Sequence, residues 1–180
     1  MTRAIHLAST DSVDTHELAA VAARTFPLAC PPSIAWANIA SFIDTNLSAA
    51  RFAEYLADPH RVILTARHDD RIVGYAMVVD GVGDDPDVAR AVEVRPAAEL
   101  SKMYVLPDFH GAGLSTALME RAVAAVADWQ VRCVWLGVNQ ENFRAQRFYT
   151  KHGFTISGTR TFLVGEDLRE NDYVMVRELR

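Results

Sequence analysis

The sequence predicts a single α/β domain over residues 1–180, built on a mixed, mostly antiparallel, twisted sheet of about six or seven strands with helices on both faces. β-rich segments form hairpin-like pairs early and late in the chain, and one strand–helix–strand unit lies between them. Hairpins pair antiparallel, whereas a helical crossover joins parallel strands, so the sheet has to be mixed. Half of the 180 residues are hydrophobic, which suits one domain with one large core.

Runs of apolar and β-branched residues between turn signals mark the strands. The expected strands are residues 3–8, 62–67, 72–79, 99–105, 132–138, 154–164 and 173–179. The second and third are joined by the short polar turn H-D-D-R, and the last two by an acidic loop. The run 132–138 is almost continuously apolar, which is typical of a central strand.

Helical periodicity predicts five helices. They are residues 13–26, 33–46, 49–57, 114–128 and 141–152. Ser33 and Ser48 are the expected N-caps of the second and third, and Gly153 is placed to end the last helix in a left-handed conformation. The Asp-rich segment 81–96 is expected to be a polar loop.

Composition excludes several classes of function. The net charge is −5 and no cluster of Lys and Arg occurs, so nucleic-acid binding is not expected. Cys30 and Cys133 form no disulfide framework, and six scattered histidines lack metal-ligand spacing, so no metal is expected. No apolar leader and no apolar run of about 18 residues occurs, which favours a cytoplasmic protein without membrane contact, either monomer or homodimer.

The segment 103–115, M-Y-V-L-P-D-F-H-G-A-G-L-S, reads as a strand, a two-glycine loop and a helix start. Gly111 and Gly113 let the chain turn sharply while its N–H groups face outward. The unpaired N–H groups and partial positive charge at a helix start attract phosphate. The Walker and dinucleotide patterns are excluded, because no lysine follows Gly113 and a third glycine is missing. A tight turn without a ligand remains the alternative.

A second segment carries Asn142, Ala145 and Tyr149 at spacings of three and four. In a helix these residues share one face, with about 10 Å between the first and the last. They form a stripe of an amide, a small residue and a phenol. The alternative is that Tyr149 packs in the core beside Phe148.

Together, H-G-A-G-L-S and L-x-V-x-x-x-N-x-x-A-x-x-x-Y-x-x-x-G-F resemble the GNAT N-acetyltransferase superfamily over residues 99–154. The resemblance implies a GNAT fold and a loop that binds the pyrophosphate of acetyl-CoA, through His110, Gly111, Ala112, Gly113, Leu114 and Ser115. It implies that the preceding strand offers backbone groups to the pantetheine arm, through Met103, Tyr104 and Val105. It also implies that Asn142 contacts the cofactor and that Tyr149 is the general acid near the thioester sulfur.

Two positions depart from the family pattern. The loop usually begins with Arg or Gln, and here it begins with His110. Its last position is usually Gly or Ala, and here it is Ser115, whose hydroxyl can donate to a phosphate oxygen. We expect binding to survive, with an affinity that His110 makes weaker or pH-dependent.

A narrower resemblance concerns the acceptor. E-L-S-K-M-Y-V-L, W-L-G-V and a tail with Phe162, Gly165, Asp172, Tyr173 and Met175 are similar to bacterial spermidine/spermine N-acetyltransferases. This resemblance implies a small polyamine-like amine as the acceptor. For such a cation we expect acids to line the acceptor groove, drawn from Asp44, Glu54, Asp84, Asp85, Asp87 and Glu93.

The expected mechanism is direct transfer, in which an amine attacks the thioester carbonyl and the CoA thiolate leaves. Deprotonating an alkylammonium with a pKa near 10.4 costs about 4–5 kcal/mol at pH 7. Glu99, at the start of the strand before the loop, is the candidate base, and a water chain or a merely solvent-facing Glu99 is the alternative. Tyr149 then protonates the sulfur. A protein N-terminal or lysine acetyltransferase and a non-catalytic acyl-CoA-binding module remain open as alternative functions.

Overall fold

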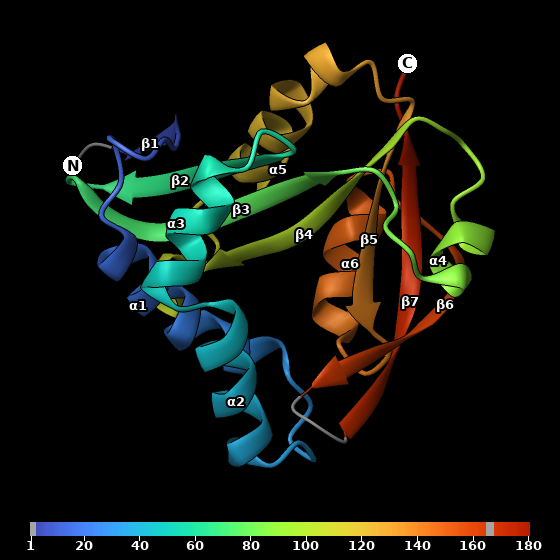
Figure 1. Cartoon of the computed structure of the whole chain (residues 1–180), viewed down its shortest axis with the longest axis horizontal. Coiled ribbons are helices and arrows are strands. Elements are labelled where there is room, and N and C mark those ends of the chain that lie inside the picture. The colour runs from blue at the N-terminus through green and yellow to red at the C-terminus, as the bar shows by residue number, and fades with distance from the viewer. Residues whose placement is uncertain (1–2, 165–167) are drawn as a thin grey trace.

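The computed structural model describes residues 3–164 and 168–180, and these form a seven-stranded sheet in the order β1-β2-β3-β4-β5-β7-β6 (Figure 1). The strands are β1 Arg3–Leu7, β2 Arg61–His68, β3 Arg71–Asp80, β4 Ala97–Val105, β5 Cys133–Asn139, β6 Thr155–Val164 and β7 Leu168–Glu178. β4 and β5 pair in parallel, and the other neighbouring pairs are antiparallel. The mixed, mostly antiparallel sheet is therefore confirmed.

Helices cover both faces of the sheet. The α-helices are α1 Thr15–Thr25, α2 Trp36–Asn46, α3 Ala49–Ala57, α4 Pro86–Ala91, α5 Leu114–Ala125 and α6 Phe143–Lys151. Short 3₁₀ turns follow α1, precede α5 and follow α5, at Phe26–Ala29, Pro107–Phe109 and Ala127–Trp129. In Figure 1, α3 lies in front of β2 and β3, and α5 lies behind them. Within the described residues no helix is both long and apolar enough to cross a bilayer.

Local side-chain caps explain where most of these helices begin. The Asp14 carboxylate accepts a hydrogen bond from the His16 N–H at 2.9 Å and starts α1. The Ser48 hydroxyl accepts from the Arg51 N–H at 3.2 Å, which confirms it as the cap of α3. The Ser33 cap was wrong, because α2 begins at Trp36 and has no side-chain cap. Gly153 follows the end of α6 with a φ of +88°, as expected.

The loop expected over 81–96 is wrong in part, because it contains α4. Asp85 caps this helix through the Asp87 N–H, and Pro86 occupies its first position, where a missing N–H costs nothing. α4 covers a second, smaller core around Trp135, whose indole N–H donates to the Gly81 carbonyl at 3.0 Å. The Asp-rich composition therefore reflects a helix start rather than an irregular segment.

The last strand is longer than the pattern indicated. β7 begins at Leu168 instead of residue 173, and it pairs with β6 along most of its length. Gly165, which belongs to the tail similar to spermidine/spermine acetyltransferases, lies outside the described residues. Cys133 is fully buried in β5, as expected.

The separation of β4 from β5 positions the functional site. The two strands pair only from Ala97 to Glu99, opposite Cys133 to Trp135, and beyond that point they diverge (Figure 1). A bulge in β4 accompanies the divergence, because Leu100 pairs with Val78 and Lys102 with Met77, which leaves Ser101 as the extra residue. The sheet therefore opens into a V with Glu99 at its apex.

Candidate active site

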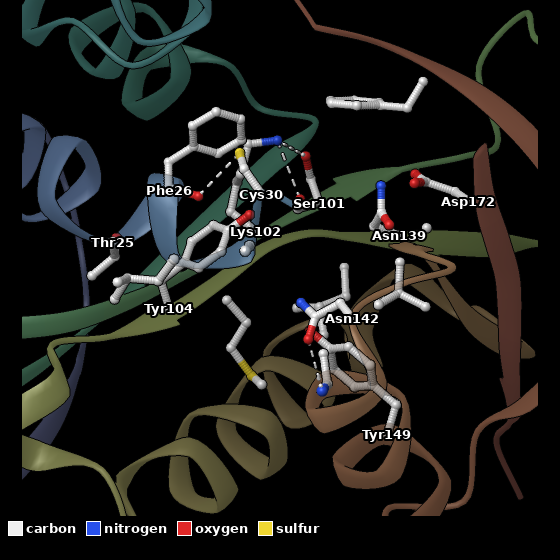
Figure 2. A pocket seen from close by; sticks show the side chains of 18 of the residues that line it. Thr25, Phe26, Cys30, Ser101, Lys102, Tyr104, Asn139, Asn142, Tyr149 and Asp172 are labelled. Carbon is white, nitrogen blue, oxygen red and sulfur yellow. Dashed lines mark hydrogen bonds between the residues drawn. The ribbon is translucent and has the colours of Figure 1, made fainter. Parts of the chain in front are cut away.

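A cavity of about 490 Å³ fills the opening between β4 and β5. β4, β5 and α6 form its sides, and α2, β6 and β7 enclose the end farther from the glycine loop. Figure 2 shows Asn142 and Tyr149 from α6 at one side, Asp172 and Asn139 across from Lys102, and Phe26 and Cys30 beyond Tyr104. Residues distant in the sequence thus meet in one enclosed space.

Most of the residues predicted for the site line this cavity. They are Glu99, Met103, Tyr104, Val105, His110, Gly111, Ser115, Asn142 and Tyr149. Ala112, Gly113 and Leu114 do not line it. Leu114 points into the core, and the carbonyl of Ala112 accepts a hydrogen bond from Arg3 at 3.5 Å.

The glycine loop has the geometry of an anion cradle. Gly111 and Gly113 adopt φ values of +76° and +79°, and a Cβ built on either would meet nothing within 4 Å. Gly113 is the N-cap of α5, so this helix has no side-chain cap on its first N–H groups. Open space in front of uncapped N–H donors fits a phosphate group.

His110 has a partner that sequence reasoning missed. Its Nε2 lies 2.7 Å from the Val105 carbonyl, and its Nδ1 lies 2.9 Å from Nη2 of Arg144. A carbonyl only accepts and a guanidinium only donates, so Nε2 carries the proton and the imidazole is neutral. Arg144, on the first turn of α6, therefore brings a permanent positive charge to the position where the loop itself lacks one.

Asn142 differs from the expected helical stripe. It precedes α6 as its N-cap, and its side-chain oxygen accepts from the Ala145 N–H at 3.1 Å. Its amide NH₂ group is left facing the cavity beside Tyr149 (Figure 2). Burial raises the pKa of Tyr149 to about 12. The phenol therefore holds its proton throughout the neutral range.

Charged side chains gather at the end of the cavity away from the glycine loop. Arg160 of β6 lies 3.3 Å from the Asp172 carboxylate and 3.8 Å from Glu99. Burial raises the pKa of Asp172, and the charge of Arg160 opposes that rise. The guanidinium lies against Gly137 of β5, where a Cβ would approach Arg160 to within 2.2 Å. Because Gly137 has no side chain, the Arg160 guanidinium fits against it and can pair with both Glu99 and Asp172.

Lys102 is the other charged residue that sequence reasoning missed at this end. Its ammonium donates to the carbonyl of Ser101 at 3.2 Å and to the hydroxyl of Ser101 at 3.4 Å. Burial lowers the pKa of Lys102. Alternation along β4 could not place it, because the bulge at Ser101 interrupts the period of two.

The acids expected to line the acceptor groove lie elsewhere. None of these six residues, Asp44, Glu54, Asp84, Asp85, Asp87 and Glu93, lines the cavity. Asp85 and Asp87 belong to the start of α4, and Glu54 pairs with Arg51 on α3 at 2.9 Å. The carboxylates that do line the cavity are Glu99, Glu170 and Asp172, because the splayed strands and β7 bring them there.

Comparison with known sequences agrees with this geometry. The profile of the Acetyltransferase (GNAT) family matches residues 26–154. An uncharacterized N-acetyltransferase of Mycobacterium tuberculosis is 64% identical over 166 residues, covering 92% of this chain and 98% of that protein. The chain belongs to the GNAT acetyltransferase family. The family match, the similarity to this relative and the geometry of the site all indicate that the protein is an N-acetyltransferase.

Solved structures share the fold. PaiA N-acetyltransferase from Thermoplasma acidophilum, in complex with coenzyme A, gives a TM-score of 0.77 at 18% identity, covering 99% of this chain and 100% of that one. A GNAT acetyltransferase from Elizabethkingia anophelis with acetyl-CoA bound gives 0.61 at 14% identity, covering 98% of each chain. The GNAT fold expected from the sequence is confirmed.

Proposed function

We propose that this protein transfers the acetyl group of acetyl-CoA to the primary amine of a small molecule held in the cavity. The observation that carries the proposal is the order of groups along one enclosed space. An uncapped helix start and glycine loop lie at one end, Tyr149 lies beside them, and the Glu99–Arg160–Asp172 cluster lies at the other end. A donor and an acceptor entering from opposite ends would meet near the apex of the V.

Acetyl-CoA supplies the acetyl group as an activated thioester. The N–H groups at the start of α5, the Ser115 hydroxyl and the Arg144 guanidinium would bind its pyrophosphate. The edge of β4 from Met103 to Val105, which β5 leaves free, would hydrogen-bond the pantetheine arm. Asn142 would donate its amide N–H to the same arm.

Two side chains would handle protons. Tyr149 keeps a proton on its Oη, because burial holds its pKa at about 12, and it would donate that proton toward the departing sulfur. Glu99, held in place by Arg160, would accept the proton of the acceptor ammonium directly or through water. Cys30 is unsuited to a covalent step, because burial raises its thiol pKa to about 11. Direct transfer is therefore the mechanism that we propose.

The enclosure of the acceptor end favours a small acceptor over a protein. The Phe42 ring of α2 and the Phe162 ring of β6 lie 5.6 Å apart, so α2 reaches across to β6 (Figure 1). An extended peptide needs an open groove, and this contact closes one side of the cavity. The narrower resemblance implies a polyamine acceptor. Glu170 and Asp172 line the cavity, but Lys102, Arg160 and Arg61 line it too, so the charges of the lining do not favour a polycation over other small amines.

Release of free thiol from acetyl-CoA tests this function directly. The purified chain is incubated with acetyl-CoA and with amino acids, diamines, spermidine, spermine and peptides with free N-termini. We expect acetylation of a small amine, identified by mass spectrometry. Turnover of peptides alone would support the protein-acetyltransferase alternative, and tight acetyl-CoA binding without any turnover would support the non-catalytic alternative.

A further inference from the structure

Lys102 is the charged group in the cavity whose position the proposed chemistry leaves unexplained. It lies on β4 just past the apex of the V, one residue beyond the bulge at Ser101. Among the described residues, its ammonium hydrogen-bonds only to the carbonyl and the hydroxyl of Ser101 (Figure 2). It lies 5.7 Å from the centroid of the Phe42 ring. Among the described residues, no carboxylate lies within ion-pairing distance of it.

The neighbouring charges are already paired with one another. Arg160 bridges Glu99 and Asp172, and Arg61 pairs with Asp58 at 3.0 Å. Glu99 and Asp172 favour the charged form of Lys102, whereas Arg160 and Arg61 oppose it. Glu170, the third carboxylate that lines the cavity, accepts a hydrogen bond from the Asn139 amide at 3.3 Å, so within the described residues none of these carboxylates pairs directly with Lys102.

Burial adds to this lack of a directly paired carboxylate. Loss of water contact is the largest cause of the lowered pKa of Lys102, and the carboxylates nearby do not restore it. A buried ammonium is stabilised by a charged hydrogen-bond acceptor, and Ser101 offers only neutral oxygens. A ligand that brings an anionic oxygen into the cavity would give the Lys102 ammonium this charged hydrogen-bond acceptor.

We propose that the acceptor is a small amine that also carries a carboxylate, as an amino acid does, and that Lys102 binds this carboxylate while Glu99 and Asp172 face the amine. This rests on the proposed function. In the reaction, the acceptor ammonium first gives one proton to Glu99, which passes it to solvent. The amine nitrogen then forms an amide bond to the acetyl carbon and the carbon–sulfur bond breaks. The CoA sulfur takes the Tyr149 proton, and the second proton lost by nitrogen restores the phenol. A polyamine would instead bring a second cation toward Lys102, Arg160 and Arg61.

The test compares acceptors that differ only in the anionic group. Each amino acid is assayed beside its carboxamide, which keeps the size and removes the charge, and beside its decarboxylated amine. L-Lysine, L-lysinamide and 1,5-diaminopentane form one such set, and leucine, leucinamide and 3-methylbutylamine form another. For at least one set, kcat/KM for the amino acid should exceed that of both partners by about 10- to 100-fold, as expected for one charge-assisted hydrogen bond.

Two variants assign the preference to Lys102. Lys102→Met replaces the charged side chain with an apolar one of similar length and should abolish the preference, so that kcat/KM for the amino acid falls to about that for its carboxamide. Lys102→Arg keeps the charge and should retain most of the preference. If Lys102 is instead a general base, Lys102→Met lowers turnover of all three members of a set together, and the proposal is wrong.

The remaining outcomes separate this proposal from the proposed function. Equal or faster turnover of the carboxamides, diamines or spermidine by the wild-type protein overturns the carboxylate proposal and leaves the acetyltransferase function intact. Persistence of the preference in Lys102→Met overturns the role of Lys102. Acetyl-CoA binding without turnover of any amine overturns the proposed function, and the carboxylate proposal falls with it.

Discussion

At the scale of single residues, burial sets the protonation of the side chains that line the cavity. The same loss of water raises the pKa of Tyr149 to about 12, raises that of Cys30 to about 11 and lowers that of Lys102. In each case the neutral form is favoured. The cavity therefore holds a phenol ready to donate and a thiol that does not compete as a nucleophile.

The role of Tyr149 is tested by removing its hydroxyl alone. Tyr149→Phe keeps the ring contacts with Phe148 and Phe154, so acetyl-CoA affinity should change little. The turnover number should fall by about 100-fold, within the range of one acid–base group. In the wild type, the raised pKa predicts no loss of activity from ionisation of Tyr149 between pH 7 and about 10. Turnover of the variant within about threefold of wild type would assign protonation of sulfur to another group or to water.

Lys102 is expected to reduce the stability of the fold, because its ammonium is placed in a cavity where burial disfavours the charged form. Lys102→Met removes a poorly compensated charge and should raise the free energy of unfolding at pH 7 by about 1 kcal/mol. The folded-state pKa lies below the ordinary value of 10.5, so the unfolded chain binds more protons between the two values. Wild-type stability therefore recovers as pH rises through this window, and the advantage of the variant shrinks.

Urea denaturation at several pH values measures this difference. Lys151→Met is the matched control, because Lys151 is exposed in the last turn of α6. The control should gain no stability at pH 7. A Lys102→Met protein that is less stable than wild type at pH 7 would show that the ammonium is well compensated in the folded state.

At the scale of elements, the start of α5 and the start of α6 converge on one ligand-binding region. Gly113 precedes α5 and gives it no side-chain cap, whereas Asn142 precedes α6 and caps it with its side chain. The first arrangement leaves N–H donors for a ligand, and the second fixes the helix that carries Arg144 and Tyr149. In the proposed function, these helix starts would bind the anion in place of a cluster of charged side chains.

Gly113→Val tests the cradle. The substitution places a β-branched residue at a φ of +79° and fills the open space in front of α5, so acetyl-CoA affinity should fall by at least about 100-fold. Gly83→Val is the control, because Gly83 has a φ of +67° and equally open surroundings in the segment before α4. Calorimetry should show unchanged affinity in the control. Equal losses in both variants would indicate backbone strain rather than blockage of the site.

The cap of α6 can be separated from the amide of Asn142. Asn142→Asp keeps the oxygen that accepts from the Ala145 N–H, whereas Asn142→Ala loses it. We expect the Ala variant to lose about 1 kcal/mol of stability and the Asp variant to lose little. Both variants lack the amide donor, so both should bind acetyl-CoA more weakly. If only the Ala variant binds weakly, Asn142 serves the helix and not the cofactor.

At the scale of the whole molecule, one sheet joins two regions that the cavity separates. The larger core packs α1, α3 and α5 against the first four strands and continues along β5 to Phe154 and Met175, and the smaller core lies under α4 around Trp135. β4 and β5 connect them through the three-residue pairing at Ala97–Glu99. A ligand bridging the V would therefore tie the two regions together.

This arrangement predicts the thermal behaviour of the protein. The chain should unfold in a single transition, as expected of one domain. Acetyl-CoA at about 100 times its Kd should raise the midpoint by about 5–10 °C. Differential scanning calorimetry measures both quantities. Two transitions, with only one shifted by acetyl-CoA, would show that residues 1–180 form two independent folding units.

The sequence by itself determined the elements whose signals are local. Two glycines before an apolar periodic run located the loop and the start of α5, Ser48 located the start of α3, and apolar and β-branched runs located six of the seven strands to within two residues. These signals are the backbone preferences of single residues and the periodic spacing of apolar side chains, and both can be recognised in a short stretch of sequence. They also sufficed for the family, because the motif spans one strand–helix–strand–helix unit.

Only the tertiary structure decided which charged residues line the cavity. The bulge at Ser101 turned Lys102 into the cavity, the absence of a Cβ at Gly137 admitted Arg160 from a strand 23 residues later, and β7 brought Asp172 to it. Of the acids expected there, Glu54 lies on α3 and Asp85 and Asp87 lie at the start of α4. Strand register and strand divergence determine which charged side chains lie near one another across the cavity. Both depend on packing between residues far apart in the sequence, so a short stretch of sequence does not predict them.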